Sequence, residues 1–373
     1  MGRRDRARAA PDRAAAPQVR IAFSPVVTLE ELGGWPAVLG PLCAGSDLPQ
    51  DLATAAMASV LRGEAGAAQI AAFAVGLRMK GETTEEMAGF VAAMLEVSET
   101  VPLPADVAAT VIDTCGTGGD RSGTINVSTI AAFVAAGAGA RVCKHGGRAA
   151  TSRAGSADVL EALGVAIELG PAEVARCVDE VGMGFCFAPR FHPAMRHAGP
   201  VRKELGVPTV FNFLGPLANP ARVRRQVVGI SDPRMAERVV GVLQANGSVH
   251  ALVVFGHDGL DELSTVAEST VFELRDGAIR SYVVDPDSFG LGGASRTDLL
   301  GSDAASNATA TRLVLEGARG PHRDIVVLNA AAALVVAGVV DDLATGVEAA
   351  AASIDSGKAA GVLDGLVALS ASV

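Results

Sequence analysis

The stretch that decides the fold is Asp113-Thr-Cys-Gly-Thr-Gly-Gly-Asp120, and Asn126-Val-Ser-Thr129 follows it as the predicted start of a helix. A β-branched run at 109–113 predicts a strand just before it, so a glycine-rich turn joins strand to helix. Glycines let backbone N–H groups approach an anion closely, and the helix N-terminus adds partial positive charge. The spacing matches neither a Walker A loop nor GxGxxG. The position favours a phosphate-binding loop, with a purely structural turn as the alternative.

Beyond this loop the alternation of predicted strands and helices continues. Short β-branched runs at 141–144, 225–231 and 250–255 alternate with helical patterns, which predicts βαβ units. Asp276-Gly277 lies between two further runs and predicts a hairpin turn. We therefore expect a mainly parallel central sheet flanked by helices.

Two helix starts are predicted from capping residues within this region. Asp232 precedes Pro233 and is expected to begin a helix that runs to Leu243. Ser156 is expected to cap a helix over 157–163.

The chain before this region has a helical pattern and no convincing strand. Helices are predicted over 51–61 and 67–80, and Thr83 with Glu86 forms a capping-box signature for a third. The predicted fold class is α/β, with a small all-helical N-terminal domain and a large α/β domain. The expected boundaries place a disordered Arg-rich tail at 1–30, the helical domain at 31–103 and the α/β domain at 104–373. Helical residues from about 190–215 are expected to join the small domain.

Composition excludes several classes of protein. The 373 residues are 49% apolar and 19% charged, so a sizeable core is available, and only 4% are aromatic. The net charge of −10 argues against a nucleic-acid partner. The longest apolar run, 325–340, is interrupted by Asn329 and is too short for a membrane span. Five scattered cysteines without a CxxC pair favour a reducing cytoplasm.

A second loop combines cations, hydroxyls and glycines. Lys144-His-Gly-Gly-Arg-Ala-Ala-Thr-Ser-Arg-Ala-Gly-Ser156 directly follows a predicted strand. These groups are what an oxyanion needs, although a solvated charged loop is the alternative.

Acidic residues gather after the strand predicted at 250–255. Asp258, Asp261 and Glu262 lie where open α/β sheets place ligands. Neighbouring carboxylates there suit Mg²⁺ shared with a substrate phosphate, although a solvated acidic turn is the alternative. The proline-rich segment 187–220 adds turns and basic residues that could orient a small anion.

Taken together, the motifs resemble those of the anthranilate phosphoribosyltransferase family. The similar segments are GTGGD at 116–120, NVST at 126–129, KHGGRAATS at 144–152, GSADVLEALG at 155–164, FAPRFHPAM at 187–195, PVRKELG at 200–206, FNFLGPLANP at 211–220, DGLDE at 258–262 and RMKGET at 78–83. The resemblance covers roughly residues 35 to 370. It implies a cytoplasmic homodimer that needs Mg²⁺ and transfers phosphoribose from 5-phosphoribosyl pyrophosphate to anthranilate. The product would be N-(5-phosphoribosyl)anthranilate, in the second step of tryptophan biosynthesis from chorismate.

The resemblance also implies roles for individual residues. Donor-binding positions would be Gly116, Gly119, Asp120, Thr124, Asn126, Val127, Ser128, Thr129, Lys144, His145, Gly146, Gly147, Arg148, Ala149, Ala150, Thr151, Ser152 and Ser156. Anthranilate would contact Gly116, Gly147, His192 and Arg202, with Arg202 facing its carboxylate. Ser128, Asp261 and Glu262 would hold the metal, and Asp261, Glu262 and Lys144 would be the catalytic residues. One position departs from the pattern, because the family usually has Asn where this chain has Gly147.

Three other functions remain open on the sequence. They are a phosphoribosyltransferase for another aromatic amine, a nucleoside phosphorylase of the same fold, and a non-catalytic paralogue that binds phosphoribosyl compounds. The aromatic amine of anthranilate is already neutral at pH 7, so positioning matters more than deprotonation. The expected catalytic contribution is electrostatic stabilisation of the departing pyrophosphate.

Overall fold

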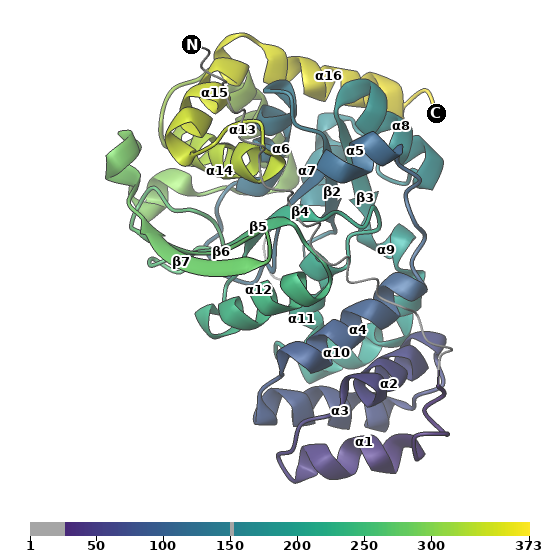
Figure 1. Ribbon diagram of the computed structural model, residues 1–373. Coiled ribbons are helices and arrows are strands. Elements are labelled where there is room, and N and C mark those ends of the chain that lie inside the picture. The colour runs from purple at the N-terminus through teal and green to yellow at the C-terminus, as the bar shows by residue number, and fades with distance from the viewer. Residues whose placement is uncertain (1–26, 150–152) are drawn as a thin grey trace, which may run out of the picture.

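A computed structural model describes residues 27–149 and 153–373, so the tail predicted at 1–30 lies outside the described residues up to position 26. Four N-terminal helices pack together in the lower part of Figure 1: α1 (Gly34–Cys43), α2 (Gln50–Arg62), α3 (Ala67–Lys80) and α4 (Thr84–Glu96). The later helix α10 (Gly199–Leu205) packs against α3. At the centre, the ring of Phe73 meets Trp35 and Phe90 edge to face, at centroid distances of 5.8 and 5.4 Å.

The predicted helix boundaries in this bundle are confirmed. Helix α2 ends at Gly63, whose φ of 75° is a left-handed cap, and α3 spans the predicted residues. At the start of α4, Thr83 Oγ1 accepts the Glu86 N–H at 3.2 Å, and Glu86 Oε2 accepts the Thr83 N–H at 2.8 Å. The capping box therefore forms in both directions.

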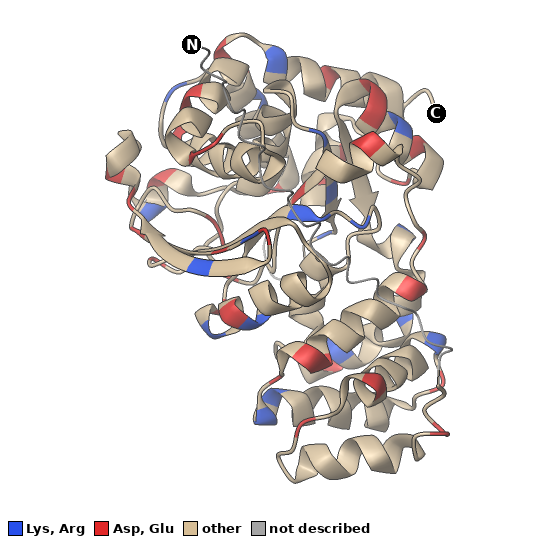
Figure 2. Cartoon of the chain, viewed as in Figure 1, with Lys and Arg blue, Asp and Glu red and all other residues tan. Residues whose placement is uncertain are grey.

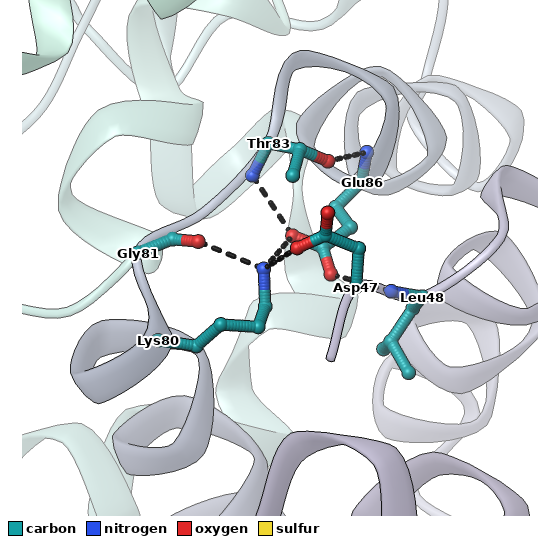
Figure 3. Close-up of polar contacts among 6 residues, drawn as sticks. All are labelled: Asp47, Leu48, Lys80, Gly81, Thr83 and Glu86. Atoms are coloured by element: carbon teal, nitrogen blue, oxygen red, sulfur yellow. Dashed lines mark hydrogen bonds and ion pairs between the residues drawn. The ribbon is translucent and has the colours of Figure 1, made fainter. Parts of the chain in front are cut away.

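A buried ion pair ties the capping box to the rest of the bundle (Figure 3). The Lys80 ammonium donates to Glu86 Oε2 at 3.0 Å, to Asp47 Oδ1 at 2.7 Å and to the Gly81 carbonyl at 2.8 Å. Glu86 Oε1 accepts the Leu48 N–H at 2.8 Å. The Glu86 side chain is 0% exposed, whereas that of Asp47 is 67% exposed. Glu86 thus connects the chain before α2, the end of α3 and the start of α4.

The α/β part is built on a seven-stranded sheet in the order β3-β2-β1-β4-β5-β6-β7. Its strands are β1 (Ile112–Gly116), β2 (Val142–Gly146), β3 (Met183–Phe187), β4 (Arg225–Gly229), β5 (His250–Gly256), β6 (Ser269–Arg275) and β7 (Ala278–Val284). The first five pair in parallel. Strand β6 pairs antiparallel with β5 and with β7, and the predicted turn at Asp276-Gly277 joins β6 to β7. The mainly parallel sheet is confirmed.

Helices cover both faces of the sheet, as Figure 1 shows. In β5, Leu252 and Val254 belong to the same apolar core as α6 (Val127–Gly137) and α14 (Pro321–Ala337). Their neighbours Ala251 and Val253 face the other way, into the core shared with α12 (Ala236–Ala245) and the helical bundle. This alternation is the two-residue period of a strand buried on both faces. The core shared with α12 therefore runs without interruption into the helical bundle.

The remaining helices pack around these layers. They are α5 (Ala105–Thr110), α7 (Ser156–Leu163), α8 (Pro171–Val181), α9 (Ala188–Phe191), α11 (Phe211–Leu214), α13 (Ala304–Leu315), α15 (Leu343–Asp355) and α16 (Lys358–Ser370). The apolar run at 325–340 supplies most of α14, a buried helix of the core. Among the described residues, no helix is both long and apolar enough to cross a membrane.

Three local predictions need correction. The strand predicted at 109–113 starts at Ile112, because residues 105–110 form a turn of helix that buries Val107. Ser156 does not cap α7 but is its first residue, while the Asp158 carboxylate accepts the Gly155 N–H at 2.8 Å. Strand β3 was not predicted, since its five buried residues precede a proline-rich segment.

The buried carboxylate of Glu86 gives a stability prediction. Glu86→Ala leaves the Lys80 ammonium with less compensation and two backbone N–H groups without acceptors. We expect the free energy of unfolding to fall by about 3 kcal/mol, measured by urea denaturation. The control Asp47→Ala removes an exposed partner of the same lysine and should lose less than about 1 kcal/mol. Equal losses in the two variants would contradict the role assigned to Glu86.

Candidate active site

The candidate site lies at the carboxyl ends of β1 and β4, where the order of the sheet reverses. From β1 the chain adds β2 and β3 on one side, and from β4 it adds β5 on the other. Such a switch point leaves a crevice in which α/β sheets bind ligands. Two adjoining cavities open there, of about 360 and 550 Å³.

The smaller cavity, here called the glycine-loop cavity, contains most of the predicted donor and metal residues. Those that line it are Gly116, Gly119, Asp120, Thr124, Asn126, Val127, Ser128, Lys144, His145, Gly146, Gly147, Arg148, Ala149, Ser156, Asp261 and Glu262. Thr129 is behind this lining, where its hydroxyl donates to Ser156 Oγ at 3.1 Å. Ala150, Thr151 and Ser152 lie outside the described residues.

The glycine loop and the acidic turn are packed against each other. The Gly118 N–H donates to Asp261 Oδ2 at 2.9 Å. A Cβ on Gly229, at the end of β4, would lie 1.6 Å from the Asp261 carbonyl oxygen, so only glycine fits there. A Cβ on Gly116 would lie 2.7 Å from Asp261 Oδ2. Two strand ends without side chains thus let the Asp261 carboxylate reach the crevice.

The two carboxylates of the turn are electrostatically unsatisfied. Burial raises the pKa of Asp261 to about 7, and the nearby Asp120 carboxylate adds to this effect. Burial also raises the pKa of Glu262, whose Oε1 accepts the Ser128 N–H at 3.1 Å at the start of α6. A divalent cation would compensate both charges. Within the described residues no cluster of three or more Asp, Glu, His or Cys could hold a metal alone, so substrate oxygens would complete the coordination.

Asp258, the third acid of this turn, does not belong to the cavity. Its Oδ2 accepts from the Ser264 hydroxyl at 3.1 Å, which holds the turn together. The acidic cluster seen in the sequence therefore divides into one structural residue and two that face the crevice.

Lys144 lies under the loop with its ammonium already bonded to protein. It donates to the Thr114 carbonyl and, at 3.2 Å, to Ser128 Oγ. Only 1% of the residue is exposed. In this arrangement Lys144 fixes the Ser128 hydroxyl at the edge of the cavity and supplies positive charge from below.

The larger cavity, here called the apolar cavity, contains all four predicted anthranilate residues. Gly116, Gly147, His192 and Arg202 line it, together with Met94, Met195, Phe211 and other mainly apolar residues. Arg148 and Arg196 add two more cations, and no Asp or Glu is among the described residues that line it. Gly116, Gly147 and Asn212 line both cavities, so a group in one can reach a group in the other.

The two histidines of the apolar cavity are held neutral. His192 Nε2 is 2.8 Å from the Ala218 carbonyl, and His145 Nδ1 is 3.0 Å from the Gly215 carbonyl. Burial lowers the pKa of His145 to about 3 and also lowers that of His192. Their rings, 5.1 Å apart at the centroids, form an uncharged wall suited to a flat aromatic ligand.

Arg202 lines this cavity without a carboxylate partner among the described residues. Its guanidinium lies 5.7 Å from the centroid of Phe211, and burial lowers its pKa. By contrast, the Arg148 guanidinium is bonded to Asp158 at 2.9 Å and to Glu161. A cation beside an aromatic ring and without a carboxylate partner suits the carboxylate of an aromatic acid.

Gly147 leaves space at the junction of the cavities. The nearest atom to a Cβ built there would be Ala188 Cβ, at 3.9 Å. Its carbonyl accepts the Ala157 N–H at 3.1 Å, which anchors the loop to α7.

Several lining residues were not predicted. In the glycine-loop cavity they are Cys115, Thr117, Gly118, Arg121, Ser122, Gly123, Ile125, Ala154, Gly155, Pro208, Asn212, Phe213 and Ser231. Most of them belong to the motifs described above and lie between predicted residues. This position in the sequence is the signal by which they could have been found. Met94 in the apolar cavity comes from α4, and nothing in the local sequence connects that helix with the sheet.

Comparison with known proteins identifies relatives over most of the chain. Residues 36–98 match the model of the glycosyl transferase family helical bundle domain, and residues 108–360 match that of its α/β domain. Anthranilate phosphoribosyltransferase of Salinispora arenicola is 52% identical over 88% of this chain and 95% of its own. That of Thermomicrobium roseum is 53% identical over 90% and 96%.

Solved structures are similar to this chain over most of its length. Anthranilate phosphoribosyltransferase from Thermus thermophilus superposes with a TM-score of 0.84 at 40% identity, covering 90% of this chain and 99% of its own. The Saccharomyces cerevisiae enzyme in complex with PRPP and Mg gives a TM-score of 0.83 at 28% identity, covering 92% and 99%. The chain described here belongs to the anthranilate phosphoribosyltransferase family.

Proposed function

We propose that this chain transfers the 5-phosphoribosyl group of 5-phosphoribosyl pyrophosphate to the amine of anthranilate, releasing pyrophosphate and forming N-(5-phosphoribosyl)anthranilate. This is the second step of tryptophan biosynthesis from chorismate. The observation that carries the proposal is the pair of adjoining cavities. One has glycine N–H groups and two buried carboxylates, and the other is apolar with an unpaired arginine. The direct test is loss of anthranilate fluorescence that requires both the donor and Mg²⁺.

The donor is assigned to the glycine-loop cavity, with Mg²⁺ held by Asp261, Glu262 and Ser128. Oxygen ligands are what Mg²⁺ prefers, and two buried carboxylates and the Ser128 hydroxyl line this one cavity. Bound Mg²⁺ would neutralise oxyanions of the leaving pyrophosphate. The glycine N–H groups and the first turn of α6 would orient the phosphates, and Lys144 would stabilise them from below.

Anthranilate is assigned to the apolar cavity, with its carboxylate on Arg202 and its ring against His192. Its neutral amine would then point toward Gly116 and Gly147, where the cavities meet. In the reaction the amine nitrogen bonds to C1 of the ribose, the C1–O bond breaks with its electron pair leaving on the pyrophosphate oxygen, and the nitrogen loses a proton to water. The residues contribute position and charge more than proton transfer, because both histidines are poor bases here.

A second acceptor class is favoured by one observation. The open space at Gly147 would admit a substituted aromatic amine beside the junction of the cavities. Comparing turnover of anthranilate with that of ring-substituted anthranilates separates the two functions. Preference for anthranilate supports the first.

We propose a division of the chain into a helical domain at 31–103, joined by helical residues from about 190–215, and a donor-binding domain at 104–373. We also propose a cytoplasmic location, which the five scattered cysteines support.

The metal assignment predicts the effect of removing both charges. Asp261→Asn combined with Glu262→Gln should lower kcat by about a hundredfold or more at saturating Mg²⁺. The variant should be at least as heat-stable as the wild type at pH 8, because ionised carboxylates with raised pKa values destabilise the fold there. In the wild type, the Mg²⁺ concentration for half-maximal rate should rise as pH falls below 7, since protons compete for Asp261. Asp258→Asn is the matched control on the same turn and should keep wild-type kcat; a double variant that also kept it would contradict the assignment.

The acceptor assignment predicts a selective change in KM. Arg202→Ala should raise the KM for anthranilate by about tenfold or more, because a charge-assisted pair is lost, and leave the donor KM nearly unchanged. Steady-state kinetics with each substrate varied in turn measures both values. Lys203→Ala, its exposed neighbour on α10 outside both cavities, should match the wild type. A rise confined to the donor KM would contradict the assignment of Arg202 to the anthranilate site.

We further propose that the chain forms a homodimer through the outer face of α1 and α3. Helix α1 carries no charged residue, as Figure 2 shows, and Met79 at the end of α3 is 84% exposed. Exposed apolar surface of this kind favours a protein partner. Sedimentation should give twice the chain mass of 37.6 kDa, and Met79→Glu should shift the equilibrium toward monomer. Wild-type protein that sediments as a monomer at micromolar concentration would contradict the dimer.

A further inference from the structure

The loop between the glycine turn and α6 contains a residue in an unusual backbone conformation. Arg121 has a φ of 57°, in the left-handed region that favours glycine. Around it Gly118, Gly119 and Gly123 have φ values of 61°, 83° and 68°. Glycine at position 121 would adopt the same conformation with less strain. The loop therefore has an arginine at a position whose backbone conformation favours glycine.

Arg121 is one of the residues that line the glycine-loop cavity, and it is exposed. Two other cations line this cavity, and both are bonded to protein. Lys144 donates to Thr114 and Ser128, and Arg148 donates to Asp158 and Glu161. Across residues 27–149 and 153–373, Arg121 makes no side-chain hydrogen bond or ion pair, although Asp120, Asp261 and Glu262 line the same cavity.

We propose that Arg121 is a donor-binding residue whose guanidinium pairs with phosphate oxygens of the bound phosphoribosyl donor. This inference rests on the proposed function. Three observations carry it: a cation without a protein partner among the described residues, a cavity whose lining includes glycine N–H groups and hydroxyls beside its carboxylates, and a backbone conformation that glycine would adopt with less strain. A guanidinium can donate two parallel N–H groups to the oxygens of one phosphate. The donor has two such groups, its pyrophosphate and its 5′-phosphate.

Isothermal titration calorimetry without anthranilate tests this on the full chain. In Arg121→Gly the Kd of the donor with Mg²⁺ should rise by about ten- to a hundredfold, the effect of losing a charge-assisted pair. The Tm should not fall, since glycine relieves the backbone. Titrations with inorganic pyrophosphate and with ribose 5-phosphate identify the group, because only the probe that Arg121 contacts should lose affinity. Arg121→Lys should recover part of the loss.

Arg222→Gly is the matched control in the same chain. Arg222 also has a left-handed φ, of 50°, and its guanidinium donates to the Leu95 carbonyl at 2.9 Å, away from both cavities. Both variants remove one positive charge and one left-handed side chain, so Arg222→Gly should bind the donor like the wild type. Donor affinity unchanged in Arg121→Gly, or equally reduced in Arg222→Gly, would overturn the inference. Wild-type protein that fails to bind the donor would instead contradict the proposed function.

Discussion

The contact on which the site depends is the packing of the Asp261 turn onto the ends of β1 and β4. The Gly118 N–H holds the Asp261 carboxylate, and Gly229 lets the Asp261 backbone lie directly on the sheet. Without this contact the two carboxylates would not face the helix N-terminus of α6 at the switch point. The sheet order, the glycines and the acidic turn are therefore parts of one arrangement.

The charges of the two cavities are distributed in opposite ways. The glycine-loop cavity combines buried carboxylates with N–H groups and hydroxyls, which suits a polyanion that arrives with a divalent cation. The apolar cavity has arginines and, among its described residues, no carboxylate, which suits a small aromatic anion. A net charge of −10 is compatible with two anionic substrates because the local charges, and not the total, decide what each cavity binds.

Much of this could be predicted from the sequence, because the informative residues are local. Thr83 and Glu86, three residues apart, indicate the start of a helix, and Asp276-Gly277 indicates a hairpin. The glycine loop marked the crevice because it follows a strand and precedes a helix. The predictions failed where contacts far along the chain decide: β3 pairs with β2, and α7 begins at Ser156, whose hydroxyl accepts from Thr129 instead of capping the helix.

The place of Met94 in the apolar cavity could not be predicted from local sequence, and for Arg121 the only local signal was its position next to the glycine loop. The left-handed φ of Arg121 and the packing of α4 against α11 and α12 are known only from the structure. The central claim is that Asp261 and Glu262 hold a divalent cation facing the donor, beside an acceptor bound at Arg202. Anomalous scattering from crystals grown with Mn²⁺, donor and an unreactive benzoate tests it most directly. The account predicts an Mn²⁺ peak between the two carboxylates and the donor phosphates, with the benzoate on Arg202. A peak at other residues, or a benzoate away from Arg202, would contradict it.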